Sequence, residues 1–464
     1  MNQNMKKNDS EKNSKVEIIQ GDPKIALKTI AWPLILTLVL NMVYNMVDRV
    51  WISGLGADPL AAIGFVTPIF IIIGGIANGF GAGVNSLISR YIGAKNKHQA
   101  SNSAIHGIII ALILSIIIPA ILLPCIKELL IVMGANAVLD YAIPYASIII
   151  IGSFTLIFNG ILSSQLRAEG DVKRATIALI LTGIINIVID PIFIYALNMG
   201  VIGAAIATIL SALVATILML YWILIKQDTY VDVKRSEFEF SKTILKQLIA
   251  VAVPGSIEQL IISLITIIMN AVLAMISTTA TVAGFSAAMS IIQVGMMVPV
   301  GIATAAITVS GVAYGARDIK RVDSICNYSI KLSMILVIIL IILMELFAPQ
   351  LALLFSYTSS SAGLSSIITD ALRILCLFLL ALPIGLCCSF IFQGMGKGVI
   401  SLILTTCREF LFILISIYIL VFTLNMGPDG AYLSLAIGAF LGSLLGLIVF
   451  KGYIKKIDKL EGYT

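Results

Sequence analysis

The stretch from Ala175 to Leu197 reads ATIALILTGIINIVIDPIFIYAL, and its only ionisable side chains are Asp190 and the weakly acidic Tyr195. About 20 apolar residues suffice for a helix to cross a bilayer, so this stretch predicts a membrane span. An acid inside such a helix costs about 2.5–3.5 kcal/mol or more unless something offsets it. Asp190, followed directly by Pro191, therefore requires an explanation.

The composition of the whole chain agrees with this reading. Residues are 59% hydrophobic and 12% charged, against about 25% charged in a typical soluble domain. Apolar runs of twenty or more residues recur too often for a soluble core, so we predict an all-α polytopic membrane protein. The twelve expected spans cover residues 25–47, 60–88, 102–124, 139–165, 174–197, 201–225, 245–276, 281–312, 328–347, 367–393, 398–423 and 430–450.

The basic residues predict the orientation of the spans. All but four of the 30 Lys and Arg residues fall on one side when the amino terminus is placed in the cytoplasm, as the positive-inside rule requires. We therefore expect a multi-pass protein of the cell (plasma) membrane with both termini cytoplasmic.

The chain also repeats itself at an offset of about 220 residues. PLILTLVLNMV at Pro33 is echoed by PGSIEQLIISL at Pro254, and LNMGVIGAAIATILS at Leu197 by LNMGPDGAYLSLAIG at Leu424. An even six-span duplication inserts both halves in the same direction and predicts two six-helix lobes related by pseudo-two-fold symmetry. The predicted parts are a cytoplasmic N-terminal tail, a first lobe, a cytoplasmic linker, a second lobe and a cytoplasmic C-terminal tail, at residues 1–24, 25–225, 226–243, 244–451 and 452–464.

This organisation is typical of secondary transporters, whose substrate site lies near the membrane midplane between repeats. The run QGMGKGV resembles a phosphate-binding loop, but its first glycine is missing and no strand precedes it. We therefore expect no enzyme activity and no cofactor. An ion gradient, worth about 2.3 kcal/mol per charge per 100 mV, would have to drive transport.

Asp190 belongs to a group of oxygen-bearing side chains. Asn186 lies four residues before it and shares its helix face, while Pro191 bends the helix and frees the carbonyl of Ile187. Carboxylate, amide and carbonyl oxygens are hard ligands that suit a small cation. The alternative reading is that Asp190 is bonded to a neighbouring helix as a structural cap.

A second acid lies in the first span. Four polar residues form one stripe on that helix, at the spacing 0, 3, 4 and 7: Asn41, Tyr44, Asn45 and Asp48. With a rise of 1.5 Å per residue, Asp190 and Thr208 both lie about 10–12 Å below the outer surface. The alternative for Asp48 alone is an interfacial acid paired with Arg49. Taken together, Asp48, Asn186, Asp190 and Thr208 are a candidate Na⁺ site, with Tyr44 and Asn45 beside it.

Other polar residues within spans give weaker indications. Glu258 lies near mid-depth of its span and would attract a cationic substrate; the alternative is a hydrogen bond across helices. Asn41, Asn159 and Gln293 would line a cavity, although such side chains also join helices by hydrogen bonds. Arg408 and Glu409 are adjacent, so they point about 100° apart on a regular helix and need not pair directly; a structural role is favoured for them.

In these motifs the chain resembles the multidrug and toxic compound extrusion (MATE) family over residues 25–450. The markers are YNMVDRVWISGLG, LRAEGD, NIVIDPIFIYALNMGVIGAAIAT and FQGMGKG. The resemblance implies two six-helix lobes and export of organic cations in exchange for Na⁺ or H⁺. Asp48, Asn186, Asp190 and Thr208 match the first-lobe ion site of the DinF-like branch, and Tyr44 and the kink-forming Pro33 match its accompanying network. The second-lobe acids of the NorM-like branch have no counterpart here.

The sequence therefore predicts a secondary active multidrug transporter that exports organic, mostly cationic and lipophilic compounds in antiport with Na⁺ or H⁺. We expect it to act as a monomer and to bind no nucleic acid. The first alternative is a flippase for lipid-linked oligosaccharides or other lipids within the same superfamily. The second alternative is a membrane receptor without transport.

Overall fold

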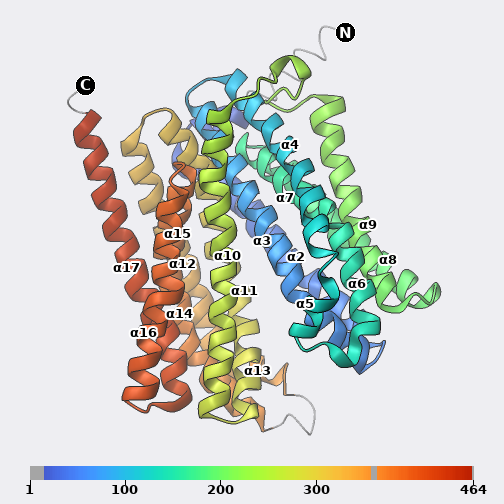
Figure 1. Cartoon of the computed structure of the whole chain (residues 1–464). Coiled ribbons are helices and arrows are strands. Elements are labelled where there is room, and N and C mark those ends of the chain that lie inside the picture. Colours follow the sequence, from blue (N-terminus) through green and yellow to red (C-terminus); the bar gives the residue numbers. More distant parts are fainter. Residues whose placement is uncertain (1–14, 357–362, 462–464) are drawn as a thin grey trace. The chain divides into compact units, whose positions relative to one another are not determined.

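The computed structural model describes residues 15–356 and 363–461, so parts of the two predicted tails lie outside the described residues. Residues 15–20 form a short helix, and no β-strand occurs in the described part of the chain (Figure 1). The further elements are α2 (Pro23–Ser53), α3 (Ala57–Gly93), α4 (Lys97–Leu122), α5 (Ile126–Val132), η1 (Asn136–Val138), α6 (Leu139–Ile151), α7 (Ser153–Ala168), α8 (Val172–Pro191), η2 (Ile192–Ala196), α9 (Gly200–Leu220), η3 (Tyr221–Lys226), η4 (Arg235–Glu237), α10 (Lys242–Ile276), α11 (Thr279–Gly315), α12 (Ile319–Leu346), α13 (Ala348–Leu353), α14 (Leu364–Gly394), α15 (Gly398–Thr406), η5 (Cys407–Leu411), α16 (Phe412–Ile417), η6 (Tyr418–Thr423) and α17 (Gly427–Glu461).

The predicted all-α polytopic fold is confirmed. Among the described residues, 11 helices are long and apolar enough to cross a membrane, and one bent pair brings the number to 12. That pair joins Asn136–Ile151 to Ser153–Ala168 at 41°, where the sequence predicts one span over residues 139–165. The bend falls at Gly152, where a Cβ atom would lie only 2.4 Å from Ile209 Cδ1 of α9. Glycine therefore allows α9 to approach closely at the bend.

The chain divides into two compact units by its internal contacts. Unit 1 contains the described residues up to Asp22 and Leu36–Ser256, and unit 2 contains Pro23–Ile35 and the described residues from Ile257 onward. The first of the three boundaries falls directly before α2, and the other two fall within α2 and α10, two residues after Pro33 and Pro254 respectively. The predicted lobe boundaries at residues 225 and 244 stay a prediction.

The internal duplication is visible in the backbone. Positive φ angles occur at Lys95 (56°) and Arg317 (59°), which occupy matching places in the repeated GAK and GAR turns. The repeated LNMG motif has positive φ angles at Asn198 and Gly200 in unit 1. In unit 2 positive φ angles occur at Asn425 and Gly427. Left-handed backbone favours glycine and asparagine, so the shared motifs specify the same turns twice.

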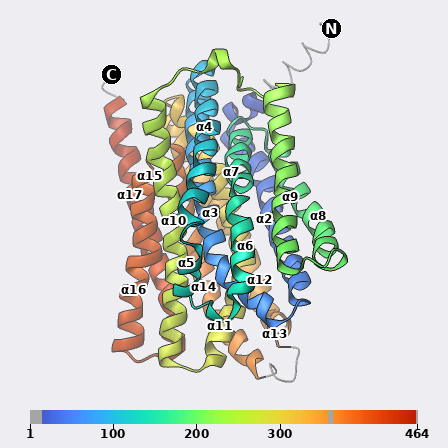
Figure 2. The ribbon, with the colours of Figure 1, turned by 45° about the vertical axis from the view of Figure 1, so that its right-hand side comes forward.

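Unit 1 is built around closely packed helices. A Cβ atom on Gly81 of α3 would lie 2.7 Å from the carbonyl oxygen of Gly160 in α7, so these two helices pack through small residues. Helices α8 and α9 lie side by side and are joined by the LNMG turn (Figure 2). This pairing positions the end of α8 that carries Asp190.

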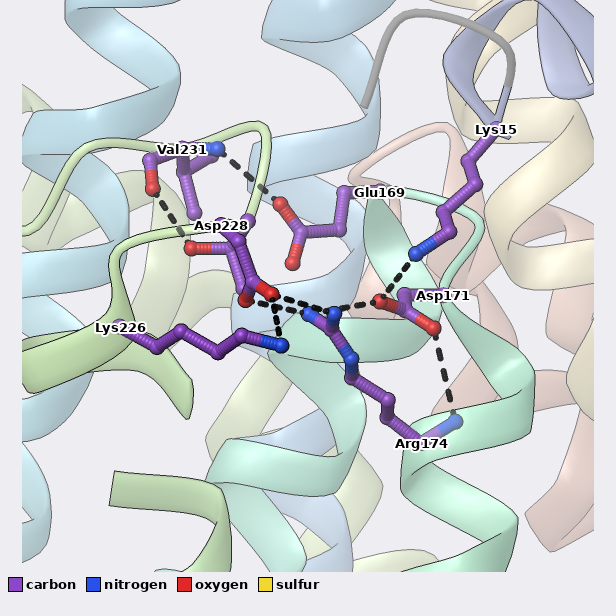
Figure 3. Close-up of polar contacts among 8 residues, drawn as sticks. Lys15, Glu169, Asp171, Arg174, Lys226, Asp228 and Val231 are labelled. Carbon is purple, nitrogen blue, oxygen red and sulfur yellow. Dashed lines mark hydrogen bonds and ion pairs between the residues drawn. The ribbon is translucent and has the colours of Figure 1, made fainter. Parts of the chain in front are cut away.

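Ion pairs bind the segment after η3 to unit 1 (Figure 3). Both terminal nitrogens of Arg174 donate to the Asp228 carboxylate at 2.7 Å, and Lys226 Nζ lies 2.8 Å from Asp228 Oδ2. Partial burial acts to raise the pKa of Asp228, but the hydrogen bonds from Lys226 and Arg174 outweigh it and hold that pKa below its usual value. Part of the predicted linker, residues 226–243, is thus fixed to this unit.

A buried acid lies beside these ion pairs. Glu169 is 1% exposed, and its Oε2 accepts a hydrogen bond of 3.0 Å from the backbone N–H of Val231. Burial raises the pKa of Glu169 to about 8, although the backbone hydrogen bond from Val231 acts in the opposite direction. Its neighbour Asp171 accepts a hydrogen bond of 2.9 Å from Lys15 Nζ (Figure 3). The helical segment at residues 15–20 is therefore tied to the same end of unit 1.

Candidate functional site

The two acids predicted from the sequence meet in unit 1. Asp48 lies on α2 and Asp190 on the last turn of α8, and the two carboxyl groups interact electrostatically with each other. Asn186 lies one turn before Asp190, and its side-chain Nδ2 donates to Asp190 Oδ1 at 3.0 Å. Asn186 and Asp190 are 1% and 0% exposed, whereas Asp48 is half-buried.

Three buried oxygens of this cluster receive no hydrogen bond from the described residues: Asp48 Oδ1, Asn186 Oδ1 and Asp190 Oδ2. Buried polar atoms in folded proteins are almost always paired, so three unpaired oxygens in one cluster require an explanation. Hard oxygen ligands of this type fit a small cation such as Na⁺, and two adjacent carboxyl groups also fit a shared proton.

Two tyrosines border the acids. Tyr44 packs against α8 at Gly183, where a Cβ atom would lie 3.3 Å from the tyrosine Cδ1, and its phenol interacts electrostatically with both carboxyl groups. Tyr145 of α6 interacts electrostatically with the same two acids and with Tyr44. Tyr145 is not predicted from the sequence, because nothing in the periodicity of its span distinguishes it from a packing residue. Its position next to Pro144 is the one local signal of irregular structure.

The end of α8 has the distortion that Pro191 predicts. The α-helix ends at Pro191 and continues as a π-helical turn, η2. The hydroxyl of Tyr195 on this turn donates to the backbone carbonyl of Trp51, and the two rings pack edge to face with centroids 6.5 Å apart. A π-helical turn places successive side chains differently from an α-helix and is frequent at functional sites. The contact joins the ends of the two helices that carry the acids.

Two further residues of the predicted ion site make no side-chain hydrogen bond to the acids among the described residues. Thr208 is half-buried on α9, and no side-chain hydrogen bond among the described residues joins it to Asp48 or Asp190. Asn45 is exposed, and its Nδ2 donates to the backbone carbonyl of Asn41 at 2.8 Å. The stripe at the spacing 0, 3, 4 and 7 therefore turns Tyr44 and Asp48 toward α8 and leaves Asn45 facing outward.

The residues predicted to line a substrate cavity have different surroundings. Asn159 on α7 is hydrogen-bonded to α9, donating to the Ala212 carbonyl at 3.1 Å and accepting from Thr216 at 3.3 Å. These bonds join two helices and use both ends of the amide. Asn41 is half-buried, and Gln293 of α11 is exposed.

Unit 2 contains a second polar cluster around Glu258. This residue is 4% exposed, and its Oε2 accepts hydrogen bonds from Gln393 Nε2 at 3.1 Å and from the Thr405 hydroxyl at 3.2 Å. Its Oε1 is buried and receives no hydrogen bond from the described residues. Glu258 therefore joins α14 and α15 to α10 through one carboxyl oxygen, while the other is buried without a hydrogen bond from the described residues.

Arg408 and Glu409 form a buried ion pair beside this acid. Arg408 Nε donates to Glu409 Oε1 at 2.8 Å, with the side chains 2% and 8% exposed. The expectation that adjacent residues need not pair rested on regular α-helical geometry, in which they diverge. The segment is instead the π-helical turn η5, Cys407–Leu411, whose wider turn changes the side-chain directions. The pair compensates its own charge within the core.

Glu258, Arg408 and Glu409 line one cavity of about 260 Å³ within unit 2. Most of its wall is apolar, with aromatic rings and flexible thioethers. The remaining lining residues are Gln259, Ile262, Ile265, Thr266, Met269, Phe285, Met289, Met296, Val300, Phe378, Leu382, Leu386, Phe390, Thr405 and Leu435.

Comparison with known proteins assigns this architecture. A family model described as MatE matches residues 33–192 and, separately, residues 254–419. The chain belongs to the MATE family. The two matches cover one half each, in agreement with the duplication read from the sequence. Proteins of this family are membrane transporters, so the chain is a transporter and not an enzyme.

Several relatives of this MATE protein have assigned functions. An FAD transporter of Shewanella oneidensis is 30% identical over 339 residues, covering 71% of this chain and 74% of that protein. The multidrug export protein MepA of Staphylococcus saprophyticus is 23% identical over 369 residues, covering 79% and 80%. A multidrug resistance MATE transporter solved in an outward-facing conformation is 38% identical, with a TM-score of 0.93, and covers 96% of this chain and 98% of that chain.

Proposed function

We propose that this MATE protein is a secondary active exporter of organic, mostly cationic and lipophilic compounds in antiport with Na⁺ or H⁺. The observation that carries the proposal is the cluster of Asp48, Asn186 and Asp190, with three buried oxygens that no described donor satisfies. This arrangement supports a first-lobe coupling site of the DinF-like type. No cofactor enters the proposal.

The cluster can respond to a cation in two ways. Two nearby carboxylates repel each other, so binding one proton between them lowers the electrostatic free energy of the cluster. A Na⁺ ion would be held instead by oxygens of Asp48, Asn186 and Asp190, with Thr208 as a further proposed ligand. Tyr44 and Tyr145 border the acids and limit the directions from which an ion can enter.

Ion binding is proposed to drive the transport cycle by shifting a conformational equilibrium. A bound cation offsets the acid pair only in arrangements that keep Asp48 and Asp190 together. It therefore stabilises those arrangements relative to the others. Because α2 and α8 each carry one acid, a change in the bend of either helix would alter the site. Substrate that enters from the cytoplasm would shift the balance back.

For the substrate, we propose Glu258 as the acidic contact, with Asn41 and Gln293 lining its path. The apolar wall of the unit 2 cavity suits a lipophilic body, and flexible methionines suit ligands of varied shape. Asn159 was predicted as a fourth lining residue, and its hydrogen bonds to α9 favour a structural role for it. We also propose insertion in the plasma membrane with both termini cytoplasmic, action as a monomer, and the lobe division predicted from the sequence.

The test is export of ethidium from proteoliposomes under Na⁺ and H⁺ gradients that are imposed separately. We expect one gradient to drive export by the wild type and neither to drive it in Asp190→Asn. Asp429→Asn, at the start of α17 and far from the acids in sequence, is the matched control and should keep wild-type export. Full export by correctly inserted Asp190→Asn would exclude the proposed coupling site.

A second candidate substrate is a flavin dinucleotide. The similarity to the FAD transporter, at 30% identity, favours it. A pyrophosphate would require free cationic side chains, whereas Arg408 in the unit 2 cavity is paired with Glu409. The same vesicles loaded with FAD discriminate between the two: gradient-driven FAD export without ethidium export would favour the second candidate.

A further inference from the structure

The cavity of unit 2 combines an apolar wall with one buried carboxylate oxygen that has no donor. Glu258 Oε2 is fixed by Gln393 and Thr405, while Oε1 is buried and receives no hydrogen bond from the described residues. Because only one of its two oxygens accepts these hydrogen bonds, the carboxylate is held in one orientation by Gln393 and Thr405. Ser401 also interacts with this carboxyl group. Oε1 keeps the capacity to accept a hydrogen bond from a ligand bound in the cavity that Glu258 lines.

The charges of the cavity limit the ligand to a monocation. Arg408 and Glu409 are paired at 2.8 Å, so together they contribute no net charge. When it is ionised, Glu258 adds a single negative charge, on which Arg408 also acts electrostatically, in a site that is otherwise mostly apolar. A neutral ligand would leave this charge uncompensated, and a dication would leave an excess positive charge beside Arg408.

The size and the wall of the cavity limit the ligand further. Its volume is about 260 Å³, slightly below the usual range for small-molecule sites, so a compact body or one end of a larger body fits. Phe285, Phe378 and Phe390 provide aromatic surface, and Met269, Met289 and Met296 provide adaptable surface.

We propose that this cavity binds compact lipophilic cations that carry an N–H group, such as protonated amines and amidinium-type cations, and that it selects them over cations without N–H. The N–H of the ligand donates to Glu258 Oε1. The inference rests on the proposed export of organic cations and adds a rule for substrate selection: charge and shape alone are insufficient.

The physical reason for this selection is that two cations of equal charge differ in whether they can donate a hydrogen bond to the Glu258 carboxylate. A quaternary or N-alkylated ring cation offers the same charge to Glu258 but no hydrogen bond. A buried acceptor left without a donor is costly, and sites built to hydrogen-bond a ligand reject analogues that lack the matching group. Selection would therefore follow the N–H group even among planar cations of similar size.

The test is binding of two fluorescent probes to the full chain in detergent, followed by fluorescence anisotropy at neutral pH. 9-Aminoacridine carries one positive charge and several N–H donors, whereas 10-methylacridinium carries one positive charge and none. We expect the Kd of 10-methylacridinium to be at least about tenfold weaker in the wild type.

Two variants locate the selection. Glu258→Gln should weaken binding of both probes, because the negative charge is lost. It should also remove most of the difference between them, because a neutral amide oxygen is a weaker acceptor than a carboxylate oxygen. Asp429→Asn, at the start of α17, should leave the difference between the probes unchanged. Equal affinity of the two probes for the wild type would overturn the proposal, whatever the behaviour of the variants, and so would an unchanged difference in correctly folded Glu258→Gln.

The result is separable from the proposed transport function because no gradient is present during the binding measurement. If the wild type discriminates between the probes but exports neither under any gradient, the site stands and the proposed antiport fails. If export is gradient-driven but the probes bind equally, the antiport stands and the selection rule fails.

Discussion

The acid cluster of unit 1 and the Glu258 cluster of unit 2 occupy halves that share their turns but not their chemistry. The repeated LNMG motif adopts left-handed backbone in both halves. At the repeat offset, however, Asp48 falls on Ile268 or Met269, and Asp190 on Ser416 or Ile417. In unit 1 the two acids form no ion pair among the described residues, although Arg49 acts electrostatically on Asp48, whereas in unit 2 Glu409 is paired with Arg408.

The difference shows which features a duplication transmits. Turn geometry depends on a few residues with special backbone freedom, and any copy of those residues reproduces it. A cluster of buried charges depends on contacts between several helices. The loss of one acid therefore abolishes the function of the whole cluster. The two units can thus keep one architecture while one serves ion coupling and the other ligand selection, as proposed here.

The sharpest way to break this comparison is to neutralise Asp190. Asp190→Asn should reduce gradient-driven ethidium export to the level of empty liposomes, because an amide neither takes up nor releases a proton and binds Na⁺ without a full charge. The fold should persist, and thermal stability should be equal or higher, since an acid costs about 2.5–3.5 kcal/mol or more within a span. Export and thermal unfolding in detergent measure the two effects.

Asp48→Asn should behave like Asp190→Asn, and the double variant should be little worse than either single variant, since groups that act as one unit are not additive. Asp429→Asn is the control for charge removal outside the cluster. Independent, multiplying losses in the double variant would show that the two acids do not form one site.

In the buried ion pair of unit 2, neutralising one acid should lower thermal stability, in contrast to Asp190→Asn. Glu409→Gln leaves the Arg408 charge without its partner, and breaking a buried pair costs about 3–5 kcal/mol, so we expect a clearly lower Tm. Replacing both residues, as in Arg408→Met with Glu409→Leu, should recover most of the loss because no unpaired charge remains. A Tm for Glu409→Gln at the wild-type value would mean that the pair is not held as described.

Neutralising the second acid of unit 2 should have a smaller, selective effect. Glu258→Gln should weaken binding of cations with N–H groups about tenfold, the value of one hydrogen bond to a charged group. The dependence of export on the Na⁺ or H⁺ gradient should stay as in the wild type. Loss of gradient-driven turnover for every substrate would instead assign ion coupling to unit 2.

The smallest expected effect concerns Glu169 and pH. Its pKa of about 8 in the folded chain exceeds its ordinary value of 4.5, so the folded state binds more protons between these pH values and its stability falls as the pH rises through this window. Glu169→Gln cannot ionise, so its Tm should fall by a few degrees less than that of the wild type between pH 5 and pH 8. Parallel Tm curves for the two proteins would contradict the raised pKa.

The sequence predicts the candidate site only in part. Asp48, Asn186 and Asp190 could be identified because an ionisable or amide group in an apolar span is costly and therefore conspicuous. Tyr145 was missed because a tyrosine in a span has an ordinary packing role, and its link to the acids depends on how α6 packs in unit 1. Thr208 has a depth similar to that of Asp190, but equal depth on two helices does not specify that the two side chains face each other.

By itself, the sequence determined the helical class, the number of spans, the duplication and the turns, because these follow from local composition and from residues with special backbone freedom. Only the tertiary structure decided the bend at Gly152, the pairing of Arg408 with Glu409, the orphan oxygen of Glu258 and the cavity beside it. The physical reason is that helix rotation, crossing and π-helical turns set side-chain contacts. In an apolar span, the rotation and crossing of the helices are fixed by packing between helices. Hydrophobic periodicity carries little information about this packing.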